Sequence, residues 1–194
     1  MTSRRVLGGV LVGGASRRMG RPKQFIETVA GTLIETVVAA LEPEVEEMIL
    51  LGEGAVPSAL ADYRRLPDAD DCRGPIAGVL SALRSTPDAS WVIAACDLPR
   101  VNARAVRWLI DQRIPGTTAV FPSIKGYFEP LLAVYEPSAR KCLEAAIADG
   151  EFSLQVLPAV SEVVKAIPPP GLERCWFNVN EPSDLETVVK ESGC

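Results

Sequence analysis

VLGGVLVGGASRRMGRPK, residues 6–23, is the stretch that decides the fold, because an apolar run leads directly into a glycine-rich basic loop. The apolar part, residues 6–12, predicts a buried strand. In the loop, glycines let backbone N–H groups approach an anion closely, and Arg17, Arg18 and Lys23 add positive charge. The loop lacks Gly-Lys-Ser/Thr and the spacing Gly-x-Gly-x-x-Gly, so it is neither a Walker A loop nor a dinucleotide fingerprint. We predict a phosphate-binding loop, with a solvated surface residue as the competing interpretation of each single cation.

Downstream, short apolar runs alternate with longer amphipathic ones, the pattern of βαβ units around a mostly parallel sheet. Strands are expected at 47–51, 91–95, 118–121, 131–135, 163–167 and 176–179. Helices are expected at 32–41, 57–64, 75–84, 102–112, 138–149 and 183–191. Residues 168–171 predict a rigid surface link and no domain boundary. The sequence therefore predicts one α/β domain over residues 1–194, with helices on both faces of the sheet.

Composition excludes several classes of function. The formal net charge of -5 argues against a nucleic-acid-binding surface and leaves a small local basic site. The chain has no histidine, which excludes Ser-His-Asp and Cys-His catalysis and any histidine metal ligand. Its five cysteines are scattered without Cys-x-x-Cys spacing, which predicts a reducing cytoplasm and no structural zinc.

The N-terminus offers one alternative, because Ser3-Arg4-Arg5-Val6-Leu7 loosely resembles a twin-arginine export signal. The apolar run behind it is short and is followed by more basic residues instead of a cleavage site. Cleavage would also remove the predicted phosphate loop, so we expect no export signal. No run approaches the roughly 20 apolar residues that span a bilayer, and we expect no membrane contact.

Asp97 follows the apolar run at 91–95 and precedes Leu98-Pro99. Ligands of open α/β sheets bind beyond the carboxyl ends of the strands. A carboxylate there is well placed to hold Mg²⁺ against the phosphates of a nucleotide. An aspartate that merely begins the turn before Pro99 is the competing interpretation, and position alone leaves both open.

Gly74-Pro75-Ile76-Ala77-Gly78 begins a helix, and its small residues allow close approach of a ligand or of a neighbouring backbone. Helix–sheet packing explains the same residues and is slightly favoured. Asp71 lies just before this segment, in an acidic run with Asp68 and Asp70. One carboxylate of the run is a candidate for binding a purine base or ribose, although a solvated acidic loop is equally consistent.

Asn178-Val179-Asn180-Glu181-Pro182 precedes the last expected helix. Asn180 is either the cap of that helix or a second polar ligand near the magnesium.

Together these segments resemble the molybdenum cofactor guanylyltransferase family, nucleotidyltransferases of Rossmann-like fold. Residues 11–23 resemble its signature, Leu-x-Gly-Gly followed by Arg-Met-Gly-x-x-Lys. Asp71 with residues 74–78 resembles its Gly-Pro-Leu/Ile-Ala-Gly segment, and residues 95–99 resemble its Cys-Asp-x-Pro strand end. Residues 129–135 and 177–182 match two later landmarks. The matches occur in family order and cover nearly the whole chain.

The resemblance implies that GTP and Mg²⁺ are bound and that GMP is transferred to the terminal phosphate of Mo-molybdopterin, with release of pyrophosphate. It further implies contacts with other molybdenum-cofactor biosynthesis proteins and with acceptor molybdoenzymes. Nucleotide contacts carried over from it are Leu11, Val12, Gly13, Gly14, Ser16, Lys23, Asp71, Gly74, Gly78 and Asp97. Arg18, Lys23 and Asp97 would be catalytic, and Asp97 and Asn180 would hold the metal. Such a transfer requires positioning and charge neutralisation and no general base, which agrees with a chain that lacks histidine.

Two departures from the family pattern concern specificity. Pro22 stands where many relatives have an acidic residue, and Val12 replaces the usual alanine. Cytidylyl transfer, or transfer to another phosphate acceptor, is therefore an alternative, although Gly13-Gly14 favours GTP. A non-catalytic nucleotide-binding module is the other alternative, and Lys23 with Asp97 argues against it.

Overall fold

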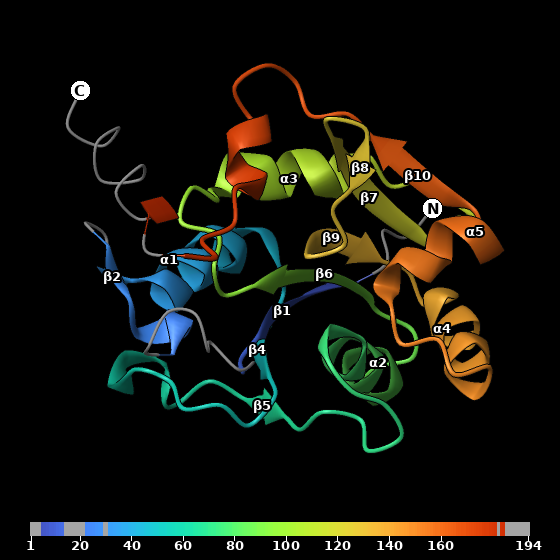
Figure 1. Cartoon of the computed structure of the whole chain (residues 1–194), viewed down its shortest axis with the longest axis horizontal. Helices are drawn as coiled ribbons and strands as arrows, with labels where there is room; N and C mark the ends of the chain where they lie inside the picture. The colour runs from blue at the N-terminus through green and yellow to red at the C-terminus, as the bar shows by residue number, and fades with distance from the viewer. Residues whose placement is uncertain (1–4, 14–21, 29–30, 182, 185–194) are drawn as a thin grey trace.

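The computed structural model describes residues 5–13, 22–28, 31–181 and 183–184, and it confirms a mostly parallel sheet flanked by helices (Figure 1). The main sheet has the order β10-β7-β9-β6-β1-β4-β5, with β8 paired to β7. Its strands are β1 (Val6–Leu11), β4 (Met48–Leu51), β5 (Arg65–Leu66), β6 (Ser90–Ala95), β7 (Ala119–Ile124), β8 (Tyr127–Phe128), β9 (Leu132–Tyr135) and β10 (Val163–Ala166). β9 runs antiparallel to both its neighbours, whereas β1 is parallel to β4 and β6.

Helices cover both faces of this sheet, with α1 and α3 on one side and α2, α4 and α5 on the other (Figure 1). They are α1 (Leu33–Leu41), α2 (Pro75–Ser85), α3 (Ala103–Asp111), α4 (Ala139–Ala148) and α5 (Leu157–Val160). Short 3₁₀ turns are η1 (Lys23–Phe25), η2 (Glu42–Glu44), η3 (Ser58–Leu60), η4 (Leu154–Val156) and η5 (Glu173–Trp176), and β2 (Glu27–Thr28) pairs with β3 (Gly31–Thr32). Among the described residues, no helix has the length and apolarity that crossing a membrane requires.

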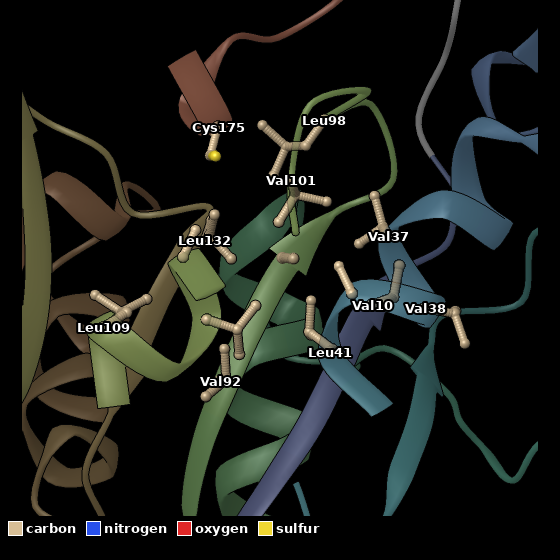
Figure 2. Packing of buried hydrophobic residues seen from close by; sticks show 14 of the residues in the cluster. Val10, Val37, Val38, Leu41, Val92, Leu98, Val101, Leu109, Leu132 and Cys175 are labelled. Atoms are coloured by element: carbon tan, nitrogen blue, oxygen red, sulfur yellow. The ribbon is translucent and has the colours of Figure 1, made fainter. Parts of the chain in front are cut away.

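Strand residues alternate between two hydrophobic cores, because successive side chains of a strand point to opposite faces. On one face, Val10 of β1 and Val92 of β6 lie against Val37 and Leu41 of α1 (Figure 2). On the other face, Leu7 and Ile93 pack with α2. Burial on both sides makes the central strands apolar throughout, as is usual for parallel sheets.

Close packing at the centre of the sheet explains the two glycines of β1. A Cβ on Gly8 would overlap Met48 Sδ, and a Cβ on Gly9 would lie 2.7 Å from Leu51 Cδ1. The glycines therefore allow side chains of β4 to lie over β1. The strand that leads to the basic loop is in this way fixed at the centre of the sheet.

The structure corrects two expected elements. The helix expected at 57–64 is only the 3₁₀ turn η3, because Leu60 is its single buried residue and the chain must turn to add β5. The strand expected at 176–179 is absent, because Trp176 ends η5 and donates its Nε1–H to Leu132 O at 2.9 Å. Of the helix expected at 183–191, residues 185–191 lie outside the described part, whereas Ser183 and Asp184 are helical.

Candidate functional site

A cleft of about 410 Å³ lies where β1 and β6 end. The two strands are parallel, with Leu11 opposite Ala95, so the residues that follow them emerge at the same edge of the sheet. Of the residues proposed from the sequence, six line this cleft: Leu11, Val12, Gly13, Lys23, Gly74 and Asp97. Asp68, one of the three carboxylates of the acidic run among which the sequence did not decide, also lines it. Five further lining residues were not proposed as site residues: Leu51, Pro75, Ala95, Cys96 and Leu131.

Two glycines give the cleft an open stretch of backbone. Gly13 has φ +135° and Gly74 has φ +75°, values that side chains rarely tolerate. A Cβ added at either position would have no atom within 4 Å. Gly74 is also the N-cap of α2, where backbone N–H groups favour an anion. Glycine is therefore required here by backbone conformation, and the bare backbone is accessible to a ligand.

Lys23, Asp97 and Asn180 meet beside the cleft although they come from three distant segments. Lys23 Nζ donates to Asp97 Oδ2 at 2.8 Å and to Asn180 Oδ1 at 2.9 Å. The side chains of Lys23 and Asp97 are only 18% and 16% exposed, so water screens their attraction less than at an open surface. Lys23 begins η1, which is anchored by the buried Gln24 through its hydrogen bond to Ala55 O at 3.1 Å. Gln24 is thus a positioning side chain that no motif indicated.

The same two oxygens belong to the chemical types that bind divalent cations. A carboxylate and an amide oxygen are hard ligands of the kind that Mg²⁺ accepts, and Mg²⁺ is commonly held by one or two carboxylates together with substrate phosphates. In the described residues, no group of three or more His, Cys, Asp or Glu side chains forms a metal cage. Asp97 and Asn180 already surround the Lys23 ammonium, so the residues fit a cation whose remaining ligands come from a nucleotide.

The structure places Asp68 in the cleft and Asp71 outside its lining. Both carboxylate oxygens of Asp71 bind Arg84, at 2.8 and 2.9 Å, and this interaction lowers the pKa of Asp71. Burial, reinforced by Glu53, instead raises the pKa of Asp68. Asp68 belongs to the acidic run that the sequence offered as a nucleotide contact. The spacing of the run could not show which of its carboxylates lines the cleft, because this depends on the folded path of the chain.

Gly78 lies on the buried side of α2, where a Cβ would overlap Leu11 Cδ2. This position agrees with the helix–sheet packing that the sequence left open, and it affects the cleft through Leu11. Burial raises the pKa of Cys96 to about 12, so its thiol is protonated at neutral pH and supplies no thiolate nucleophile. Gly14, Ser16, Arg17 and Arg18 lie outside the described residues, and their roles remain predictions.

Known families, sequences and structures match this chain over most of its length. The model of the MobA-like NTP transferase domain matches residues 8–186. The molybdenum cofactor guanylyltransferase of Pseudomonas putida is 32% identical, over 91% of this chain and 94% of that protein. A probable molybdenum cofactor guanylyltransferase of Bacillus cytotoxicus is 25% identical, over 96% of this chain and 98% of that protein. The crystal structure of molybdopterin-guanine dinucleotide biosynthesis protein A from Archaeoglobus fulgidus superposes with a TM-score of 0.78 at 28% identity, covering 96% of this chain and 98% of that one.

Proposed function

The chain belongs to the MobA-like NTP transferase family, and from this membership we propose that it transfers GMP from GTP to the terminal phosphate of Mo-molybdopterin. In this reaction an oxygen of the acceptor phosphate attacks the α-phosphorus of GTP. The bond between the α-phosphorus and the bridging oxygen breaks, and pyrophosphate leaves. The observation that carries the proposal is the convergence of Lys23, Asp97 and Asn180 beside a cleft with open glycine backbone.

The residues support the reaction by position and charge. The open backbone at Gly13 and at Gly74, the N-cap of α2, lines the cleft and would lie against an anionic ligand, and Asp68 is a candidate for the ribose or base in place of Asp71. Lys23 would exchange its contact with Asp97 for one with the phosphates, which neutralises charge as pyrophosphate departs. Mg²⁺, held by Asp97 and Asn180, would supply Lewis-acid stabilisation of the phosphate charge. The acceptor phosphate is already ionised near neutral pH, so no side chain has to remove a proton.

The direct test is incubation of the purified chain with GTP, Mg²⁺ and molybdenum-loaded molybdopterin, followed by mass spectrometry of the products. We expect a guanine dinucleotide cofactor and an equal amount of pyrophosphate. CTP in place of GTP serves as the matched control. A cytosine dinucleotide formed at the same rate, or no dinucleotide at all, would contradict the proposal.

A further inference from the structure

The segment that carries Asn180 is fastened to the end of β6 by its backbone. Val179 N donates to Asp97 O at 3.0 Å, and the side chain of Val179 is fully buried. Directly after it, the side chain of Asn180 accepts from Lys23. One residue of this segment therefore contacts the backbone of Asp97, and the next contacts the ammonium group that pairs with the Asp97 carboxylate.

Asp184 holds this segment from the other side. Asp184 Oδ2 accepts from Asn180 N at 2.7 Å and from Glu181 N at 2.9 Å, and Asp184 N donates to Glu181 O at 3.0 Å. Asn180 is itself exposed, so packing does little to fix its backbone, and these hydrogen bonds supply the constraint. The two N–H groups lower the pKa of Asp184, and the positive charge of Lys23 adds a smaller contribution in the same direction. These hydrogen bonds hold the backbone of Asn180 and Glu181 against the carboxylate of Asp184.

We propose that Asp184 is a positioning residue for nucleotidyl transfer, which acts by fixing the backbone of Asn180 so that the amide oxygen of Asn180 stays on Lys23. This role rests on the proposed function. The local alternative is that Asp184 merely caps the backbone N–H groups of Asn180 and Glu181, in which case its loss would change stability but not the placement of Lys23. Without Asp184, the Asn180 N–H loses its acceptor, and the amide oxygen of Asn180 is no longer fixed on Lys23, although Val179 still ties the segment to the backbone of Asp97.

A double-mutant cycle tests whether Asp184 acts through Asn180. We expect Asp184→Ala to lower kcat about tenfold with a smaller change in the KM for GTP, because misplaced catalytic groups cost rate. Asp184→Asn keeps an oxygen that accepts the same N–H groups, and it should recover most of the loss. In an Asn180→Ala background, Asp184→Ala should have little further effect. Additive losses in the double variant, or unchanged kcat in Asp184→Ala, would overturn the proposal.

A second measurement reads the placement of Lys23 without substrate. Under limiting acetic anhydride, acylation of Lys23, quantified by peptide mass spectrometry, should be faster in Asp184→Ala and in Asn180→Ala than in the wild type. Glu151→Ala is the matched control, because Glu151 Oε1 accepts from Ser153 N at 2.9 Å in an exposed turn after α4. We expect this control to keep wild-type kcat and wild-type labelling of Lys23. Equal acylation of Lys23 in Asp184→Ala and the wild type would overturn the positioning role.

The two readouts separate this proposal from the proposed function. A wild-type chain that forms no guanine dinucleotide would contradict the function. Faster acylation of Lys23 in Asp184→Ala would still support the link from Asp184 through Asn180 to Lys23.

Discussion

At the residue scale, the most informative pair is Lys23 and Asp97. In the free protein the carboxylate is already neutralised by the ammonium at 2.8 Å. A lone divalent ion would have to displace that ammonium, whereas a metal–nucleotide complex offers the lysine new phosphate partners. The pair therefore favours joint binding of metal and nucleotide over binding of the metal alone.

Asp97→Asn should lower turnover by about 100-fold or more, because the amide cannot supply the negative charge that holds the metal against the phosphates. The fold should survive, since Asp97 lies after the end of β6 and its amide oxygen could still accept from Lys23. Initial rates of GMP transfer measure the first effect, and thermal unfolding followed by circular dichroism measures the second. A variant with most of the wild-type activity would contradict the metal role of Asp97.

Asp68→Asn and Asp71→Asn form a matched pair within one acidic run. We expect Asp68→Asn to weaken GTP binding about tenfold, because Asp68 lines the cleft. The same change should keep or raise Tm: burial raises the pKa of Asp68, so the folded state disfavours its charged form. Asp71→Asn should leave GTP affinity unchanged and lower Tm slightly, since it weakens the interaction with Arg84. Calorimetric titration with GTP and Mg²⁺ measures the affinity of both variants. A larger loss of GTP affinity in Asp71→Asn than in Asp68→Asn would restore Asp71 as the nucleotide contact.

At the scale of elements, α2 and β1 build the cleft together. Gly78 lets the helix approach Leu11, while Gly74 opens the N-terminus of the same helix to a ligand. Both positions require glycine, but for different reasons. A side chain at Gly78 would collide with Leu11, whereas Gly74 has a backbone conformation that other residues rarely adopt.

Gly78→Ala should destabilise the fold by about 1–3 kcal/mol, because its methyl group would overlap Leu11 in a packed region. GTP affinity should fall with it, since Leu11 is displaced toward the cleft that it lines. Chemical denaturation and calorimetric titration measure the two effects. Ser81→Ala, on the same helix and partly exposed, is the control, and we expect it to change neither. An unchanged free energy of unfolding in Gly78→Ala would contradict the requirement for close packing between α2 and Leu11.

The elements also show what the sequence could predict. Long periodic segments such as α1 and α3, and apolar runs such as β6, were predicted within one or two residues, because burial on two faces leaves a strong pattern. The prediction of a strand at 176–179 was wrong because its apolar residues are buried without forming a ladder of backbone hydrogen bonds. Trp176 packs in the core against Trp108 of α3, and Val179 is buried after the end of η5. Lys23 and Asp97 were identified by motif, but their contact with each other depends on segments 74 residues apart. Asp68 and Asp184 required the folded path of the chain.

At the scale of the whole molecule, the proposed reaction requires a chain of net charge -5 to bind a polyanion. Long-range attraction cannot supply this binding, so it must come from local groups at one edge of the sheet. The two cores on either face of the sheet hold that edge in place. A divalent ion that offsets the phosphate charge is consequently expected to be essential for affinity.

The thermal stability of the chain should therefore rise most with GTP and Mg²⁺ together. A ligand at 100 times its Kd adds about 2.7 kcal/mol to the free energy of unfolding. For a chain of this size, this corresponds to an increase in Tm of about 5–10 °C. We expect smaller shifts with CTP, UTP or ATP, as the double glycine Gly13-Gly14 favours GTP, and smaller shifts for every nucleotide when EDTA removes the metal.

Equal shifts for all four nucleotides would contradict the guanylyl assignment, and shifts that persist in EDTA would contradict joint binding of metal and nucleotide. The variant Asp97→Asn separates the contribution of the metal from that of the nucleotide, because its shift in Tm with GTP should be the same with and without Mg²⁺.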